Sequence, residues 1–240
     1  MSLRSAFREA EKPIIAITVG DVAGIGPELS LRCIASSTVL DRCVPVLIGP
    51  HDALKKIGGV VGATVPDVSS AKTPNRESAP TLIDIGSVNA DTLQPGVFSA
   101  QTGQASFEAV QFAIEQTMRG RFDAIVTGPI QKEAWHLAGA PYLGHTELLA
   151  DRTMTADYCM MLSGPTCSTV LVTIHLPLLD AVKSLSTEAI ERAIRLGGMA
   201  MESRLRRPPR IMVLGLNPHA GESGLLSHGD EEQLIIPAIE

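Results

Sequence analysis

The chain has 240 residues, of which 45% are hydrophobic and only 3% aromatic, and its formal net charge is −6. The acidic balance argues against general nucleic-acid binding, and no apolar run approaches the roughly 20 residues that a membrane span needs. The length exceeds the commonest domain size of about 100–150 residues, so we expect one large α/β unit or two lobes.

The N-terminus and the cysteines indicate a cytoplasmic protein. Residues 1–12 are charged and lack the apolar stretch of a signal peptide, and we expect them to form a mobile segment before an α/β region over residues 13–240. None of the four cysteines forms a C-x-x-C pair, which disfavours a structural zinc ribbon. Cys33 and Cys43 could bridge, but free thiols in a reducing cytosol are the favoured interpretation.

In the first half of the chain, short apolar runs alternate with helical stretches. Pro27 and Glu28 are typical of a first helical turn, because proline needs no amide partner there and an acid suits the positive end of the helix dipole. Residues 60–80 have weak periodicity, and we expect short strands and loops there. The other predicted elements are strands over residues 13–19, 44–48 and 81–85, a turn over 20–26 and a helix over 51–57.

The second half alternates in the same way. The predicted helices cover residues 103–120, 132–138, 147–153 and 187–202, and a further helix starts at residue 230. The predicted strands cover residues 124–127, 159–162, 169–174 and 211–214, with the second and third of these as candidate antiparallel neighbours. Alternation of this kind predicts an α/β fold with a mostly parallel sheet and helices on both faces.

A glycine-rich turn follows the first predicted strand. Its spacing, G-x-x-x-G-x-G over residues 20–26, does not match the dinucleotide fingerprint G-x-G-x-x-G. A tight strand-to-helix turn and a ligand-lining loop therefore both remain open. Asp21 is the reason to keep the second possibility, because ligands of open α/β sheets bind at the carboxyl ends of the strands.

Three histidines occur in or just beyond predicted strand ends. They are His145, His175 and His219, the last within the polar stretch LNPHAGE at residues 216–222. This placement suggests one shared site. Two neutral imidazoles that converge are a common divalent-metal arrangement, and His175 and His219 are the candidates. Such a site needs a third ligand, for which His145 is the only other strand-end histidine.

Four ordered motifs resemble those of the 4-hydroxythreonine-4-phosphate dehydrogenases of vitamin B6 biosynthesis. The first is TVGDVAGIGPE at residues 18–28, and the second joins TGPI and Lys132 to GHTE at residues 144–147. The third and fourth are TIHLPL at residues 173–178 and LNPHAGE at residues 216–222. The match is collinear from about residue 13 to residue 240.

The resemblance implies a two-lobed α/β fold like that of isocitrate and isopropylmalate dehydrogenases, with the site in a cleft. It also implies NAD or NADP and a divalent metal (Zn, Mg or Co) as cofactors. The implied reaction oxidises the C3 hydroxyl of 4-phosphooxy-L-threonine and then decarboxylates the product to 3-amino-2-oxopropyl phosphate, in pyridoxal phosphate biosynthesis. Such enzymes work as homodimers with shared active sites, without nucleic acid or membrane partners.

By motif position, the resemblance assigns roles to six residues. His175 and His219 would be metal ligands, and His145 and Thr146 would contact the substrate, including its phosphate end. Lys132 and Asp21 would serve the catalytic step, although a solvated helix lysine is an equal alternative for Lys132. The family usually has proline where this chain has Val22, which should loosen the turn without removing a chemical group.

The chain ends before the family's C-terminal segment, which would carry the third metal ligand and much of the cofactor surface. We therefore expect a fragment of a longer enzyme in preference to an inactive relative. Two alternatives to the main function stay open. One is a dehydrogenase of D-threonate or D-erythronate 4-phosphate, and the other is a non-catalytic ligand-binding relative.

Overall fold

The computed structural model describes residues 12–68 and 79–240, so nearly all of the predicted mobile segment over residues 1–12 lies outside the described residues, as does much of the predicted loop region over 60–80. The chain divides into two compact units, Met1–Met154 and Thr155–Glu240. Within the described ranges, no helix is long and apolar enough to cross a membrane. The four cysteines are free thiols, as predicted.

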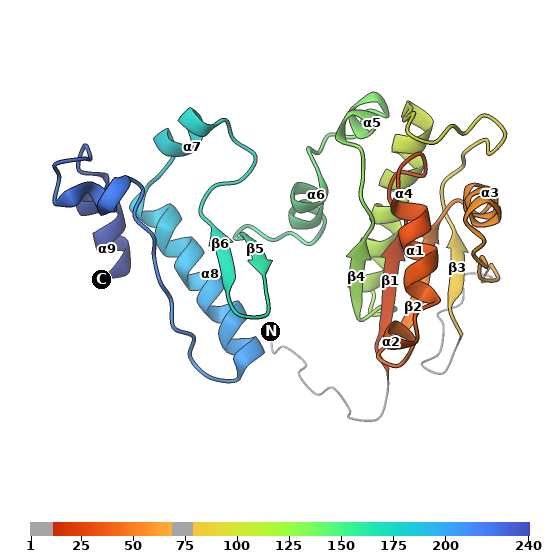
Figure 1. The fold of residues 1–240 in the computed structure, drawn as a ribbon, viewed down its shortest axis with the longest axis horizontal. Coiled ribbons are helices and arrows are strands. Elements are labelled where there is room, and N and C mark those ends of the chain that lie inside the picture. The colour runs from red at the N-terminus through yellow and green to blue at the C-terminus, as the bar shows by residue number, and fades with distance from the viewer. Residues whose placement is uncertain (1–11, 69–78) are drawn as a thin grey trace. The chain divides into compact units, whose positions relative to one another are not determined.

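The first unit contains a parallel four-stranded sheet with the order β3-β2-β1-β4 (Figure 1). Every pairing is parallel, with Ala16 of β1 opposite Val46 of β2 and Ile125 of β4. All four strands were predicted from their short apolar runs. Their bounds are Ile14–Thr18 for β1, Val44–Gly49 for β2, Thr81–Asp84 for β3 and Ala124–Thr127 for β4.

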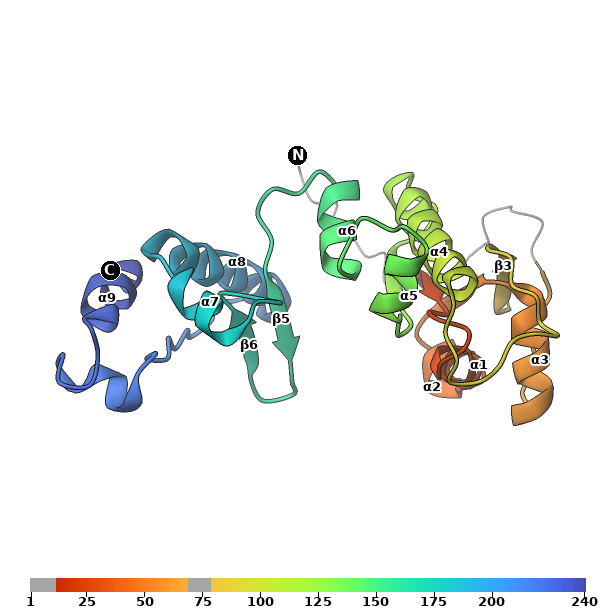
Figure 2. The same cartoon turned by 90° about the horizontal axis from the view of Figure 1, so that it is seen from above.

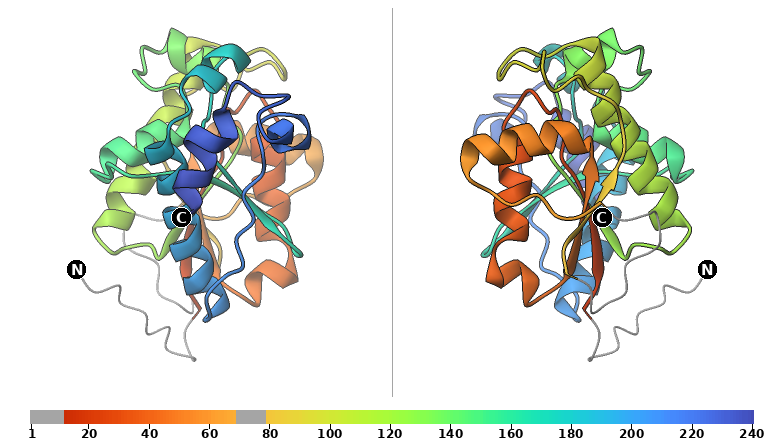
Figure 3. Two further views of the ribbon diagram at one scale, coloured as in Figure 1. Left: turned by 90° about the vertical axis from the view of Figure 1, so that its left-hand side faces the viewer. Right: turned by 90° about the vertical axis from the view of Figure 1, so that its right-hand side faces the viewer.

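Helices cover both faces of this sheet, as the alternation predicted. They include α1 (Gly26–Ile34) and α3 (His51–Val61) on one face and α4 (Ala100–Met118) on the other (Figure 3). Side chains alternate along a strand, so Ile17 packs with the α1 and α3 side while Ala16 packs with α4. Strands that are buried on both faces consist almost entirely of apolar residues, which explains why the sequence revealed β1 and β2.

Several helix boundaries differ from the prediction because of local capping. Helix α4 begins three residues earlier than predicted, since the Ser99 hydroxyl accepts from Thr102 N and Thr102 Oγ1 accepts from Ser99 N. These two bonds form a reciprocal capping box. Helix α3 runs on to Val61 and ends at Gly62, which is left-handed. A short helix α2 (Ser37–Leu40) had not been predicted.

Helices α5 (Lys132–Leu137) and α6 (His145–Arg152) complete the first unit. Helix α5 packs directly on α4 (Figure 2). The approach is close because Gly103 has no side chain, and a Cβ there would overlap the carbonyl of Ala134. The indole of Trp135 is fully buried in this contact and donates from Nε1 to Ser106 Oγ at 2.8 Å.

The second unit contains an antiparallel hairpin and helices. Its strands β5 (Met160–Ser163) and β6 (Ser168–Leu171) pair as predicted. Helix α8 (Thr187–Leu205) begins after Ser186, whose hydroxyl accepts from Ala189 N. The remaining elements are α7 (Leu178–Lys183), the 3-10 turn η1 (Pro218–Glu222), the π-helical turn η2 (Glu231–Ile235) and α9 (Ile236–Ile239).

The predicted strand over residues 211–214 is wrong. The segment is irregular, and Met212 and Leu214 are 84% and 75% exposed. A strand needs a neighbour to satisfy its backbone groups, and no strand in the described part of the chain pairs with this one. Only Val213 packs against the small core formed by Ile190, Ile235 and Ala238. The apolar run was therefore a correct sign of hydrophobicity and a wrong sign of pairing.

Candidate active site

The carboxyl ends of β1 and β4 are joined by tight backbone contacts. Strand order changes direction between these two neighbours, which is the place where open α/β sheets bind ligands. Asp21 N donates to Pro129 O at 3.0 Å, and Gly128 N donates to Thr18 O at 2.7 Å. Gly20 has a φ of +74°, and a Cβ on it would overlap Pro129 O. The glycine turn is therefore explained by loop packing, which favours the tight-turn interpretation.

Asp21 uses both carboxylate oxygens within the protein. Its side chain is only 3% exposed. Oδ1 accepts from Ala23 N at 2.8 Å, and Oδ2 accepts from Thr102 Oγ1 at 3.2 Å. Asp21 thereby ties the glycine turn to the capped start of α4. These bonds support a positioning role, and direct participation in catalysis stays a prediction.

His145 and Thr146 are the first two residues of α6, two residues earlier than the helix was predicted to start. The opening amides of a helix lack intrahelical partners and carry positive partial charge. The imidazole of His145 packs edge-on against Trp135, with ring centroids 5.5 Å apart. Its Nε2 is buried and has no hydrogen-bond partner among the described residues. A buried polar atom of this kind calls for a ligand or water.

Burial sets the charge of His145. Desolvation disfavours the imidazolium and lowers the pKa of His145, and the nearby Glu147 carboxylate opposes this only in part. The neutral ring offers one donor and one acceptor. His145 is thus suited to hydrogen bonding with a substrate oxygen.

Lys132 lies beside this helix start. It is the exposed first residue of α5. A Cβ on Gly144, the residue before His145, would lie 3.8 Å from Lys132 Cε. The structure therefore brings Lys132, His145 and Thr146 together within the first unit. The Glu147 carboxylate lies at the same place, with Oε2 3.6 Å from that Cβ. Lys132 supplies a positive charge against it, and the helix amides and the imidazole supply the donors that would suit an anionic group.

The two predicted metal ligands lie in the second unit. His175 follows β6, and His219 lies in η1 after the irregular segment. Both side chains belong to exposed residues with positive φ, at +55° and +54°. Residues other than glycine rarely adopt this conformation, and where they do it often marks a functional site. Because His145 belongs to the first unit, the convergence of all three histidines stays a prediction.

Imidazole nitrogens are suitable ligands for divalent ions such as zinc, so the chemistry of His175 and His219 fits a metal. Two histidines are too few donors to complete a metal site. Among the residues that the structure describes, no three His, Cys, Asp or Glu side chains group so as to hold a metal ion. A further donor has to come from elsewhere.

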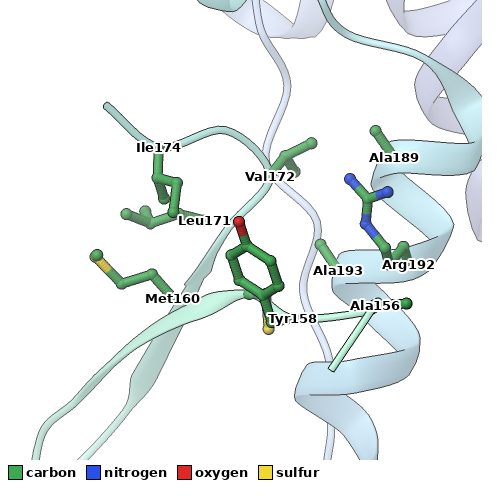
Figure 4. Close-up of a pocket in the computed structure, with 10 residues that line it drawn as sticks. Ala156, Tyr158, Met160, Leu171, Val172, Ile174, Ala189, Arg192 and Ala193 are labelled. Atoms are coloured by element: carbon green, nitrogen blue, oxygen red, sulfur yellow. The ribbon is translucent and has the colours of Figure 1, made fainter. Parts of the chain in front are cut away.

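The second unit also contains a cavity of about 310 Å³ between the β5–β6 hairpin and α8 (Figure 4). Most of its lining residues are of apolar type, and Arg192 is the one charged residue among them. The cavity includes Ile174, the chain neighbour of His175, but neither predicted metal ligand lines it. The cavity is therefore distinct from the residues expected to carry chemistry.

Two contributors to the site were missed by sequence reasoning. Trp135 supports the His145 ring, and the carboxylate of Glu231 contacts the segment before His219. Trp135 is the single tryptophan of the chain, which was a signal of a special position. Glu231 was interpreted only as part of a helix start, and its contact with residues far earlier in the chain carries no local sequence signal.

Comparison with known proteins identifies close relatives. The family model "Pyridoxal phosphate biosynthetic protein PdxA" matches residues 41–240. The chain is 42% identical to the 4-hydroxythreonine-4-phosphate dehydrogenase of Desulfosudis oleivorans, over 95% of this chain and 68% of that protein. It is 39% identical to the D-threonate 4-phosphate dehydrogenase of Cupriavidus necator, over 95% of this chain and 69% of that protein.

A solved structure agrees with the fold. The crystal structure of the 4-hydroxythreonine-4-phosphate dehydrogenase from Klebsiella pneumoniae matches with a TM-score of 0.80 and 33% sequence identity. The match covers 96% of this chain and 70% of that one. The predicted fold class, an α/β fold of the isocitrate dehydrogenase-like type with a mostly parallel sheet, is confirmed.

Proposed function

The chain belongs to the family of the pyridoxal phosphate biosynthetic protein PdxA, and from that membership we propose that it is a dehydrogenase of a four-carbon hydroxy acid that carries a 4-phosphate. The observation that carries the proposal is the anion-suited group formed by Lys132, His145 and Thr146. The buried Nε2 of His145 without a protein partner supplies the specific hydrogen-bonding position.

The primary candidate substrate is 4-phosphooxy-L-threonine. When bound, NAD or NADP would accept the hydride from C3 as the C3–H bond breaks, while the C3 hydroxyl would lose its proton. The resulting 3-oxo acid then loses carbon dioxide by cleavage of its bond to the carboxylate. The electron pair remains on the adjacent carbon, which takes up a proton to give 3-amino-2-oxopropyl phosphate.

The first unit would hold the phosphate end of the substrate. Thr146 and the opening amides of α6 donate hydrogen bonds, and neutral His145 donates or accepts at Nε2. Lys132 supplies a positive charge next to Gly144. Asp21 keeps the glycine turn closed against the start of α4. In this proposal Lys132 acts by charge and Asp21 by positioning.

The second unit would supply metal ligands. A bound Zn, Mg or Co ion polarises a substrate oxygen and so favours loss of the hydroxyl proton. His175 and His219 hold their imidazoles at exposed, left-handed positions, where the side chains could reach such an ion. The described residues provide no three-donor group, so a third donor would come from outside them. From the family resemblance we also propose a homodimer with shared active sites. A cytoplasmic location agrees with the proposed metabolic role.

A second candidate substrate has support from the relatives. The Cupriavidus necator protein, at 39% identity, is named for D-threonate 4-phosphate. Threonate and erythronate 4-phosphates carry a hydroxyl where phosphooxy-threonine carries an amine, and they share the phosphate that the first unit would hold. A non-catalytic binding protein is the third candidate. Such a protein would use the phosphate site of the first unit and would not require the histidines of the second unit.

The test compares the three phosphorylated acids as substrates of the 240-residue chain, with zinc present and with NAD or NADP. Formation of reduced nicotinamide is followed by absorbance. We expect metal-dependent binding of at least one substrate and its loss in His219→Ala, with turnover once a third metal donor is supplied. Phosphate-ester binding without turnover, unaffected by chelator or by His219→Ala, would overturn the dehydrogenase proposal in favour of the binding protein.

A further inference from the structure

Glu231 is a buried carboxylate whose hydrogen-bond partners are amide groups. It is 4% exposed and, with Asp21, one of two acidic side chains that are buried within the described ranges. Removing a carboxylate from water is unfavourable unless hydrogen bonds replace the lost hydration. The partners of Glu231 therefore show what the fold gains from placing it there.

Its partners are donors from a segment more than a dozen residues earlier. Oε1 accepts from Asn217 N at 2.7 Å and from Leu216 N at 3.0 Å. The Asn217 side chain donates from Nδ2 to Oε2 at 3.1 Å and also reaches Asp230 Oδ2 at 3.1 Å. Charged acceptors make the stronger class of hydrogen bond. Glu231 thus binds both the backbone and the side chain of Asn217.

These amides lie directly after an irregular segment of the chain. Residues 211–215 are irregular and pair with no strand in the described chain. Buried or half-buried backbone amides must be paired with some acceptor. The carboxylate of Glu231 pairs two amides just beyond that segment, at the point where the chain turns toward His219.

The same carboxylate also lies against the far side of the turn. Gly221 has a φ of +79°, and a Cβ on it would lie 2.7 Å from Glu231 Oε2. Between these two contacts, His219 and Ala220 both have positive φ, at +54° and +50°. Consecutive left-handed residues other than glycine persist only where surrounding contacts over-determine them. Glu231 contacts the turn on both sides of those residues.

We propose that Glu231 is a positioning residue that fixes the turn over Pro218–Glu222 and thereby sets the direction of the His219 imidazole. It acts through the backbone of Leu216 and Asn217 and does not bind the metal. The proposal rests on the proposed function, because a fixed direction matters only if His219 is a ligand. Residues that orient metal ligands typically change affinity about 10–100-fold when they are altered.

The experiment measures zinc binding by calorimetry on the full chain and on four variants, three at positions 231 and 232 and the fourth His219→Ala. Glu231→Ala removes the acceptor, and we expect about tenfold weaker zinc binding. Glu232→Ala is the matched control, since Glu232 is the exposed neighbour of Glu231, and it should bind zinc as the unmodified chain does. Glu231→Gln keeps a neutral acceptor and should restore part of the affinity. Wild-type affinity in folded Glu231→Ala would overturn the proposal.

A second readout does not depend on metal. Amide hydrogen exchange over residues 216–223 in the metal-free chain should be faster in Glu231→Ala than in Glu232→Ala. If circular dichroism shows that Glu231→Ala is unfolded, Glu231→Gln decides by the same two measurements, with unchanged exchange and affinity counting against the proposal. His219→Ala separates the two hypotheses. Unchanged zinc binding in His219→Ala refutes the metal role, while the exchange data still decide whether Glu231 holds the turn.

Discussion

Replacement of Gly103 by alanine should destabilise the first unit and disturb the anion-suited group. A Cβ at this position would overlap the carbonyl of Ala134 in α5. The obstacle is backbone, so it cannot move aside as a side-chain end would. Overpacking of this kind costs about 1–3 kcal/mol, and we take about 3 kcal/mol because a helix has to shift. The better helix propensity of alanine returns about 1 kcal/mol.

The expected net loss is therefore about 2 kcal/mol of unfolding free energy. For a unit of this size that corresponds to a melting temperature lowered by about 4–8 °C. Urea unfolding followed by tryptophan fluorescence measures it cleanly. Trp135 is the only tryptophan of the chain and belongs to the first unit, so the signal reports that unit without contribution from the second.

Gly59 provides the matched control. It lies in the interior of α3, it is exposed, and a Cβ placed on it meets no atom within 4 Å. Gly59→Ala should therefore stabilise the unit by about 0.5–1 kcal/mol. If Gly103→Ala proved as stable as Gly59→Ala, the inference that α5 is held against α4 by the absence of a side chain would be refuted. Phosphate-ester binding should fall in Gly103→Ala alone, because α5 carries Lys132.

Two further outcomes are expected. Burial lowers the pKa of His145 in the folded state, so the unfolded chain binds the proton more readily. The unfolding free energy therefore has its full value above about pH 6.5 and falls as the pH drops through the folded pKa of His145. His145→Gln should flatten that dependence in urea unfolding measured between about pH 7.5 and about pH 5, and an unchanged slope would count against it. Asp21→Asn weakens the acceptor for Ala23 N and Thr102 Oγ1 and should lower unfolding free energy by about 1–3 kcal/mol, whereas the exposed Asp91→Asn should change it by less than about 0.5 kcal/mol.

Local sequence signals were sufficient to predict many of the strands and helices of the first unit. Strands β1 and β2 are short apolar runs because both of their faces are covered by helices. Helix α8 begins at Thr187, as predicted, and the Ser186 hydroxyl caps it by accepting from Ala189 N, a position where serine is a favoured residue. Helix α4 was predicted to start too late, since the mutual bonds of Ser99 and Thr102 were not recognised as a capping box.

For the candidate site, too, some features could be predicted from the sequence and others depended on contacts in space. Motif order identified the family and selected His145, His175 and His219, since the residue types and their spacing are properties of the chain itself. The pairing of residues 211–214 was not such a property, because a strand exists only if a partner lies beside it.

What each side chain does at the site was decided by contacts between distant residues. The bond from Thr102 gives Asp21 a positioning role that the sequence did not show, while its predicted catalytic role stays a prediction. Glu231 was predicted only as part of a helix start, and the structure shows that its carboxylate accepts hydrogen bonds from the amides of Leu216 and Asn217. A sequence displays which groups are present and which backbone shapes they favour locally. Only tertiary structure brings the donors that engage a carboxylate, because hydrogen-bond partners are chosen by proximity in space.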